Sequence, residues 1–199
     1  MEELIEIDGS LHEGGGQMIR SSLALSLLFK KEFRMVNIRK NRPNPGINNQ
    51  LRSVFSAFTD KLPKIGDFEV YFFPKFLEPK EIKAATAASC TLMMQCLVPV
   101  FTGIGYDQLV KVNGGTDVSR SPPLESVKLM LIPLLQRMGV ILEIGDVKPG
   151  YFPVGKGFVD IKVPKIEEIR PIRMVELGKP STVVITYYVK DNKVPGSSK

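Results

Sequence analysis

The order of strand-like and helix-like segments recurs after roughly 75 residues, and this recurrence constrains the fold more than any single motif. Val110 repeats the place of Val36 after 74 residues, and Leu142 repeats the place of Val70 after 72. Each unit has the order β-α-β-α-β-β. Because helices that alternate with strands cover the faces of a sheet, the pattern predicts an α/β fold of layered, tandem β-α-β-α-β-β repeats.

The apolar pattern places the elements of each unit. The first unit is predicted to have strands at 4–7, 33–38 and 68–73 and helices at 14–29 and 51–58. The second is predicted to have strands at 82–84, 109–112, 140–144 and 158–163 and helices at 86–101 and 124–138. The apolar run at 68–73 predicts a strand buried on both faces, and Pro133 predicts a kink in the last helix.

These patterns divide the chain into four parts. A first repeat is expected over residues 1–80, a second over 81–166 and the start of an incomplete third over 167–190, with strands at 170–177 and 183–189. Residues 191–199 are polar and contain Pro, Gly and two Ser, which predicts a disordered tail.

Composition excludes several classes of protein. The single histidine, His12, excludes mechanisms that need several histidines, and two cysteines, Cys90 and Cys96, exclude a disulfide framework and a four-cysteine zinc site. The longest apolar run is seven residues, well short of a membrane helix, and the acidic start lacks the layout of a signal peptide. A reduced, cytoplasmic protein with no membrane partner is therefore expected. The net charge of 27 − 21 = +6 permits binding to phosphate-rich partners.

The densest group of candidate functional residues surrounds a glycine run. Gly14, Gly15 and Gly16 stand between a predicted strand and a predicted helix, where backbone amides favour an anion such as phosphate. Gln17 and Arg20 share one face of that helix, and the carboxylate of Glu13 could hold a divalent metal that bridges to phosphate. The alternative is a glycine-rich turn in which Glu13 caps the helix and Arg20 is solvated.

A basic segment forms the second group. Arg39, Lys40 and Arg42 precede a helix that carries Gln50, and guanidinium groups suit phosphate oxygens. The alternative is a solvated basic loop.

Three isolated features have structural alternatives. Gln95 is polar within an apolar helix, and it either serves a site or is a buried amide bonded to backbone. His12 could act as a nucleophile or base, although an exposed loop histidine fits better. Cys90 and Cys96, six residues apart, fit small core residues.

Taken together, these residues resemble the RNA 3′-terminal phosphate cyclase family over about residues 4–175. The stretches that carry the resemblance are Ile7–Ser10 with Glu13–Gln17 and Arg20, Asn37–Arg39 with Arg42 and Pro45–Gly46, Gln50, Gly114–Asp117 with Ser121–Pro123, and Gly150–Pro153 with Gly155 and Gly157. The resemblance implies repeated β-α-β-α-β-β units, as in the related enolpyruvyl transferases. It also implies the family reaction, in which ATP converts an RNA 3′-phosphate into a 2′,3′-cyclic phosphate through an adenylylated enzyme histidine.

By the same resemblance, each candidate residue acquires a role. Glu13 would hold Mg²⁺ or Mn²⁺. The residues expected at the RNA phosphate are Gln17, Arg20, Arg39, Arg42 and Gln50, and those expected at the nucleotide are Gly14, Gly15, Gln95 and Pro122.

The chain departs from the family pattern in two places. The family's nucleophilic histidine lies near the end of a complete third repeat, beyond these residues, and His12 matches no such position, so no catalytic nucleophile is identified. The adenosine half of the site is altered, because Ser126 stands where an aromatic residue is usual. Lys83, Ala85, Ala88 and Lys156 also replace family residues.

Three functions remain open at this point. The first is a short cyclase that uses a replacement nucleophile or is completed by a second chain. The second is a cyclase-like protein that binds RNA 3′-phosphate ends without turnover, in RNA processing or ribosome biogenesis. The third is a fragment without a function of its own. An enolpyruvyl transferase is a distant fourth. An apolar flank left by the incomplete third repeat predicts self-association or a partner chain.

Overall fold

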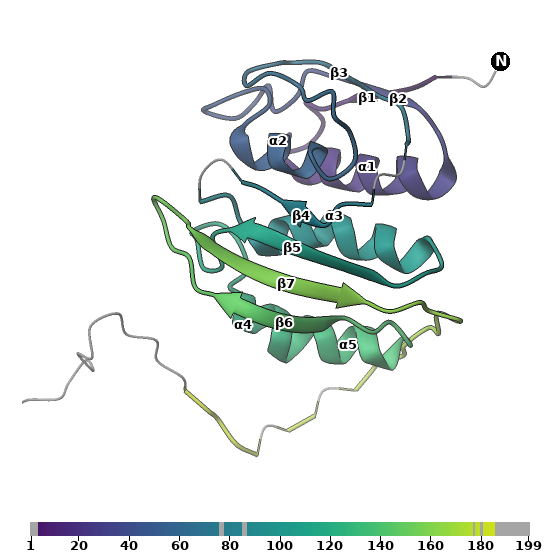
Figure 1. Ribbon diagram of the computed structural model, residues 1–199, viewed down its shortest axis with the longest axis vertical. Coiled ribbons are helices and arrows are strands. Elements are labelled where there is room, and N and C mark those ends of the chain that lie inside the picture. The colour runs from purple at the N-terminus through teal and green to yellow at the C-terminus, as the bar shows by residue number, and fades with distance from the viewer. Residues whose placement is uncertain (1–3, 76–77, 85–86, 177, 180, 186–199) are drawn as a thin grey trace, which may run out of the picture.

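The computed structural model describes residues 4–75, 78–84, 87–176, 178–179 and 181–185. The chain has an α/β fold with two sheets (Figure 1). Helices from both halves of the chain lie between the two sheets, where α3 packs against α1 and α2 on one side and against β5 and β7 on the other. No helix in these ranges is long and apolar enough to cross a membrane.

The first sheet has the strand order β1-β2-β3. β1 (Ile5–Asp8) and β2 (Phe33–Val36) are parallel, and α1 (Gln17–Phe29) connects them. α2 (Asn49–Phe55) then leads to β3 (Val70–Phe72), which is antiparallel to β2. The carboxyl ends of β1 and β2 therefore lie at the same edge of the sheet, and the loops that leave this edge carry Glu13 and Arg39.

The second sheet has the strand order β4-β5-β7-β6. β4 (Glu81–Ile82) and β5 (Gln108–Gly114) are parallel and are connected by α3 (Cys90–Gly103). β7 (Gly157–Val163) and β6 (Glu143–Lys148) complete the sheet as antiparallel strands, with an irregularity between Ile144 and Val147. Each sheet thus contains one parallel β-α-β unit, as the recurring sequence pattern predicts.

The contact between α1 and α3 joins the halves of the core. Leu23 on α1 and Cys96 on α3 are completely buried. The end of α3 approaches α1 closely, because a Cβ atom at Gly103 would press on Cδ2 of Leu28. Cys90 is also buried and both thiols are free, which agrees with their prediction as small core residues.

The strand predicted at 68–73 is shorter and is not buried on both faces. Val70 and Phe72 are buried against the helices, whereas Tyr71 and Phe73 are 54% and 63% exposed. The reason is that helices cover only one face of the first sheet. On the other face Arg34 pairs with Glu6 and Glu69 and lies over the Tyr71 ring.

The helix predicted at 124–138 is divided by a π-helical turn. It consists of α4 (Leu124–Ser126), the π-helix η1 (Val127–Leu131) and α5 (Ile132–Arg137). Pro133 has no backbone N–H to donate, and it lies in the first turn of α5, where that donor is not needed. The break that Pro133 predicts is therefore accommodated by the wider turn that precedes it.

Three strands predicted in the last part of the chain differ from the structure over the described residues. Residues 140–144 begin with a buried turn, in which the Val140 amide donates to the Leu135 carbonyl, and β6 begins only at Glu143. The described parts of 170–177 and 183–189, which are 170–176 and 183–185, form no strand. Strands need a hydrogen-bonded neighbour, and the Arg170 amide instead donates to the Met138 carbonyl at the end of α5. The tail expected at 191–199 lies outside the described residues.

Strand pairing also corrects one detail of the recurrence. β3 lies antiparallel beside β2 as β7 lies antiparallel beside β5, so the strand that contains Val70 corresponds by pairing to β7. Leu142 instead precedes the outer strand β6. The repeat boundaries at residues 80 and 166 stay predictions.

Candidate functional site

The glycine run forms the turn between β1 and α1. Gly14 has φ +58°, and a Cβ atom there would lie 3.2 Å from the Gly9 carbonyl oxygen, so a side chain at this position would be strained. A Cβ atom at Gly15 would lie 2.7 Å from Oε1 of Glu13 and 3.3 Å from Nη2 of Arg42. Gly15 therefore leaves room for these two side chains to meet. Gly16 is the N-cap of α1 and has no side chain to satisfy the helix amides.

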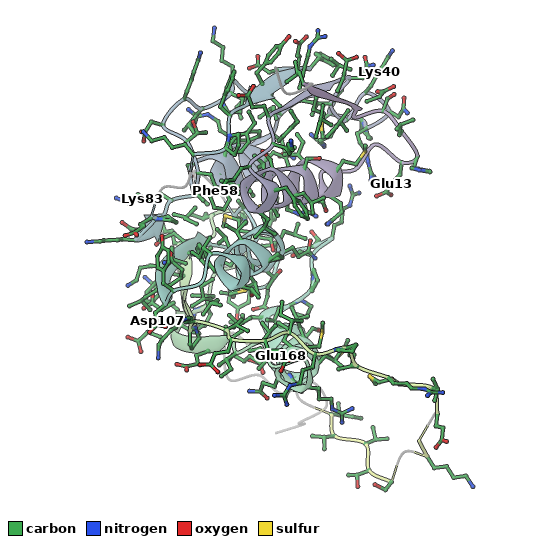
Figure 2. The ribbon with its side chains drawn as sticks, turned by 90° about the vertical axis from the view of Figure 1, so that its right-hand side faces the viewer. Glu13, Lys40, Phe58, Lys83, Asp107 and Glu168 are labelled. Atoms are coloured by element: carbon green, nitrogen blue, oxygen red, sulfur yellow. The ribbon has the colours of Figure 1, made fainter. Side chains whose placement is uncertain are left out.

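Glu13 and Arg42 form an ion pair across this turn. The Arg42 Nη2 atom lies 3.0 Å from Glu13 Oε2, and the two side chains are 36% and 75% exposed. Exposed ion pairs contribute about 0–1 kcal/mol, so this contact opens at little cost. Both charged groups are thus available to a ligand. Figure 2 shows Glu13 and Lys40 on the same side of the molecule.

Arg20 is a buried cation without a carboxylate partner among the described residues. Its side chain is 7% exposed, and its Nη2 atom donates to Gln17 Oε1 at 2.7 Å and to Gln95 Oε1 at 3.1 Å. The buried Nε atom has no hydrogen-bond partner. Burial lowers the pKa of Arg20 from its ordinary value, although arginine stays charged in proteins. The side-chain amides of Gln17 and Gln95 are neutral and leave the positive charge of Arg20 unbalanced. An anion in front of the guanidinium would therefore be attracted to it.

Arg39 is held by the backbone of its own loop. It has φ +53°, and its Nη1 atom donates to the Gly46 carbonyl at 3.0 Å. Burial lowers the pKa of Arg39, and the nearby positive charge of Arg42 lowers it further. Like charges held this close repel one another, which favours binding of an anion between them.

Gln50 connects the two halves of the chain. Its Oε1 atom accepts from the Ser89 amide at 2.5 Å, and its Nε2 atom donates to the Ser89 carbonyl at 3.2 Å. Ser89 is the N-cap of α3, with its side chain accepting from the Leu92 amide. Both ends of the Gln50 amide are therefore engaged in holding α3 beside α2.

Seven of the ten predicted site residues meet in one open pocket of about 330 Å³, which we call the arginine pocket. Its charged lining consists of four arginines and Glu13, a net charge of 4 − 1 = +3. The lining residues are Glu13, Gly15, Gly16, Gln17, Arg20, Arg39, Arg42, Pro43, Asn44, Asn48, Gln50, Leu51, Leu92 and Arg120.

Arg120 is the functional residue that the sequence analysis missed. It lies in the loop between β5 and α4 with φ +64° and brings a charge from the second sheet to the arginine pocket. Its position between Asp117 and the proline pair of the 121–123 stretch was a signal, because that loop was already among the motifs that carry the family resemblance.

The other three predicted residues do not line this pocket. Gly14 is buried and shapes the turn before the pocket residue Gly15. Gln95 is exposed, so its interpretation as a buried amide is wrong, and it acts by holding Arg20. Pro122 is exposed, and its carbonyl accepts from Thr91 Oγ1 at 2.7 Å. His12 is also exposed, on the turn before Glu13, and does not line the pocket.

The described residues offer one carboxylate, that of Glu13, to a metal at the arginine pocket. In the described ranges no three His, Cys, Asp or Glu side chains converge as a metal site. Mg²⁺, however, is commonly held by one or two carboxylates together with water and substrate phosphates. The exposed carboxylate of Glu13, at the edge of a pocket lined by four arginines, fits that arrangement.

A neutral pocket of about 620 Å³ adjoins the arginine pocket and shares with it Asn44, Asn48, Gln50 and Leu92. Its remaining lining comes from α2, the segment that leads into α3, the loop after β5 and the loop between β6 and β7. Those residues are Asn49, Ala87, Ala88, Ser89, Val118, Ser119, Ser121, Phe152 and Pro153.

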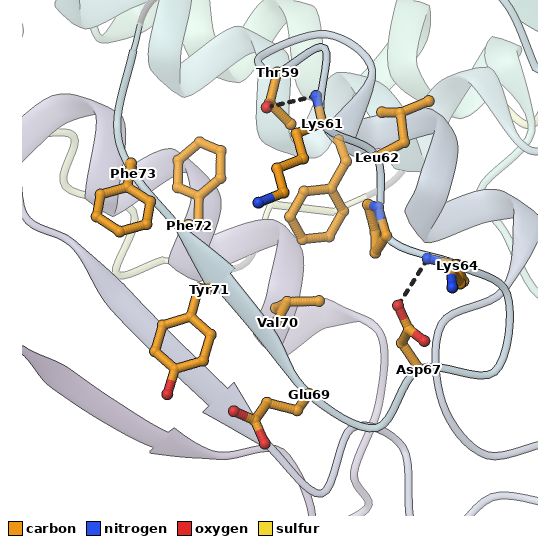
Figure 3. A pocket seen from close by; sticks show the side chains of 12 residues that line it. Thr59, Lys61, Leu62, Lys64, Asp67, Glu69, Val70, Tyr71, Phe72 and Phe73 are labelled. Atoms are coloured by element: carbon orange, nitrogen blue, oxygen red, sulfur yellow. Dashed lines mark hydrogen bonds between the residues drawn. The ribbon is translucent and has the colours of Figure 1, made fainter.

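A further pocket of about 340 Å³ lies between the end of α2 and β3 (Figure 3). Lys61 and Lys64 are balanced there by Asp67 and Glu69, and the Lys64 amide donates to Asp67 Oδ2 at 2.7 Å. This balance makes it a poor phosphate site and leaves the arginine pocket as the candidate.

Comparison with known proteins finds a matching family. The sequence model for RNA 3′-terminal phosphate cyclase matches residues 11–194. The RNA 3′-terminal phosphate cyclase of Staphylothermus marinus is 41% identical over 187 residues, which cover 89% of this chain and 52% of that protein.

Two further relatives bear the same name. The protein of Thermococcus kodakarensis is 37% identical over 182 residues, covering 87% of this chain and 52% of the relative. The protein of Saccharolobus solfataricus is 38% identical over 169 residues, covering 80% and 49%. The chain therefore spans about half the length of the curated relatives it matches.

Proposed function

The chain belongs to the RNA 3′-terminal phosphate cyclase family, and on this premise we propose that its arginine pocket binds the 3′-phosphate of an RNA. We further propose that the bound phosphate is the group that the family reaction converts, with ATP, into a 2′,3′-cyclic phosphate. The observation that carries the proposal is the convergence of Arg20, Arg39, Arg42 and Arg120 on one open pocket.

The arginines would contribute to binding of a phosphate dianion in different ways. Arg20 is fixed by Gln17 and Gln95 and presents a charge whose position changes little on binding. Among the described residues Arg42 forms an ion pair only with the exposed carboxylate of Glu13, so it can turn toward the phosphate when this pair opens. Guanidinium forks suit phosphate oxygens because each can donate two parallel hydrogen bonds.

Glu13 is the residue that would hold a divalent cation. Once Arg42 turns to the phosphate, the Glu13 carboxylate is free to bind Mg²⁺ or Mn²⁺ from the side of the solvent. A metal held by Glu13 would supply neutralisation of phosphate charge. In the family reaction the neighbouring 2′-hydroxyl would attack the adenylylated 3′-phosphate, with AMP as the leaving group. ATP is proposed as co-substrate from the family relationship. Of the residues expected at the nucleotide, Gly15 lines the arginine pocket.

Binding of matched RNAs tests the phosphate site. Fluorescence anisotropy would compare one RNA sequence ending in a 3′-phosphate or a 3′-hydroxyl, with the wild type, Arg42→Ala and the control Lys40→Ala. Lys40 is exposed on the same side of the molecule but does not line the pocket. Loss of charge-assisted hydrogen bonds predicts that Arg42→Ala weakens binding of the phosphate end about tenfold or more and that of the hydroxyl end much less. Equal weakening of both would indicate a general backbone contact and reject the phosphate site.

Binding without turnover is a second candidate function. It is favoured by one observation: His12, the single histidine of the sequence, lies outside the arginine pocket. Incubation with ATP, Mg²⁺ or Mn²⁺ and a 3′-phosphate RNA would decide between the two, with a full-length relative as positive control. A 2′,3′-cyclic end supports the cyclase reaction, whereas phosphate-specific binding without product supports a binding module.

A further inference from the structure

The neutral pocket beside the arginine pocket differs from it in chemistry. None of the described residues that line it is charged. Amides and hydroxyls are supplied by Asn44, Asn49, Ser119 and Ser121, and apolar contact is supplied by Phe152 and its neighbours. Polar neutral groups beside an aromatic surface suit a nucleoside, whose sugar and base edges form hydrogen bonds and whose base stacks.

One loop serves both pockets. Ser119 and Ser121 line the neutral pocket, whereas Arg120 between them lines the arginine pocket. Ser121 Oγ donates to the Val118 carbonyl at 2.8 Å, which fixes the turn that separates them. A ligand with an anionic group next to a neutral, planar group would therefore contact both sides of this loop.

Phe152 is the aromatic side chain at the rim. It is 76% exposed, although the loop that carries it is firmly anchored at its base. The Gly155 amide donates to the Tyr151 carbonyl at 2.8 Å, and the Thr116 amide donates to the Gly150 carbonyl at 2.9 Å. A large apolar ring held out to solvent on an anchored loop is available for stacking at little entropic cost.

We propose that the neutral pocket holds the nucleoside of the RNA's 3′-terminal nucleotide, with its base stacked on Phe152, while its 3′-phosphate lies among the arginines. This inference rests on the proposed function, because it takes the phosphate in the arginine pocket to be that of an RNA end. The nucleoside of ATP is the competing source of the same chemistry. Gln95 and Pro122, which the family resemblance gives to the nucleotide, do not line this pocket.

A set of four RNAs tests the inference. All share one sequence, end in either 3′-phosphate or 3′-hydroxyl, and carry at the last position either a normal base or an abasic ribose. Their affinities are measured for the wild type, Phe152→Ala and the control Phe29→Ala, which removes another exposed aromatic ring, at the end of α1. Calorimetry measures ATP binding to the same three proteins, and circular dichroism checks their folding.

Loss of one base stack predicts that Phe152→Ala weakens binding of the RNA with a normal last base about tenfold. Binding of the abasic RNA and of ATP should change less than about twofold, and Phe29→Ala should change none of them. A terminal 2-aminopurine gives an independent signal: its fluorescence should fall on binding to the wild type and to Phe29→Ala but much less with Phe152→Ala.

Other results would overturn the inference. Equal effects of Phe152→Ala on normal and abasic ends, or no effect on either, exclude stacking on the last base. Weakened ATP binding with unchanged RNA binding would assign the pocket to the nucleoside of ATP. The proposed function is tested separately, and it fails if the wild type binds phosphate and hydroxyl ends with equal affinity. The role of the last base is tested by comparing the normal and abasic RNAs that have the same 3′ end.

Discussion

Replacing Arg20 by methionine should stabilise the fold while weakening the phosphate site. Arg20 is 7% exposed, and its described acceptors are the neutral amides of Gln17 and Gln95. Its buried Nε atom has no partner within the described part of the chain. Removing an ion from water costs several kcal/mol, and two hydrogen bonds from a charged group return about 1.5–3 kcal/mol each. The unpartnered Nε adds a penalty of about 1–3 kcal/mol.

Desolvation outweighs the two hydrogen bonds in this balance, so Arg20→Met should raise the free energy of unfolding by about 1 kcal/mol. Methionine keeps the apolar packing of the arginine stem. The two glutamines are exposed, so water can satisfy their oxygens once Arg20 is gone. For a chain of this size, 1 kcal/mol corresponds to a rise in Tm of about 2–4 °C. Binding of a 3′-phosphate RNA should weaken about tenfold or more, the loss expected for one charge-assisted contact.

Urea titration and thermal unfolding measure the free energy of unfolding, and anisotropy measures the RNA affinity. Lys40→Met is the matched control, because it removes an exposed positive charge from the same side and should change stability by less than about 0.5 kcal/mol. The reasoning is refuted if Arg20→Met lowers stability by more than about 1 kcal/mol or leaves RNA affinity unchanged. The first result would mean that the hydrogen bonds outweigh desolvation, and the second that Arg20 has a structural role only.

Three further predictions test other parts of the molecule. Gln50→Ala removes both hydrogen bonds to Ser89 and should lower the free energy of unfolding by about 1–2 kcal/mol in urea titration; an unchanged midpoint would mean that water replaces them. Burial raises the pKa of Cys90 and of Cys96 to about 12, so neither thiol should react with a disulfide reagent at pH 8 until urea unfolds the protein, and rapid reaction of the native protein would contradict their burial. Leu129 is 73% exposed on η1, and self-association there predicts a mass above the monomer in light scattering that Leu129→Glu lowers; a monomeric wild type at micromolar concentration would count against it.

Local patterns predicted much of the arginine pocket. The glycine run, Glu13, Arg20, Arg39 and Arg42 were identified because short-range spacing places them at a strand end, a helix start and an adjacent loop. The parallel pairing of β1 and β2 then brings the two loops to the same edge of the sheet. Family membership and the α/β class followed from the same residues.

Contacts between distant segments were not predictable in this way. Gln50 meets Ser89 and Arg20 meets Gln95 only because α1 and α2 pack on α3, and no periodicity states which helix faces meet. The prediction that β3 is buried on both faces is wrong for a similar reason. An apolar run in the sequence does not tell how many faces of a sheet are covered by helices. The strands expected after residue 169 failed in the described part because strand propensity needs a neighbouring strand.

The geometry of the two pockets explains why one half of the chain would not suffice for the proposed function. The part of the chain that builds β1, α1, β2 and the loop after β2 supplies Glu13 and three of the four arginines, but Arg120 comes from the loop after β5. The neutral pocket is also lined from both halves, by Asn49 from α2 and by Phe152 from the loop after β6. A terminal nucleotide that occupies both pockets would therefore tie the halves together, as Gln50 does through Ser89. A 3′-phosphate RNA should accordingly raise the Tm of the whole chain in proportion to the logarithm of its concentration, and it should do so less for Phe152→Ala than for Phe29→Ala.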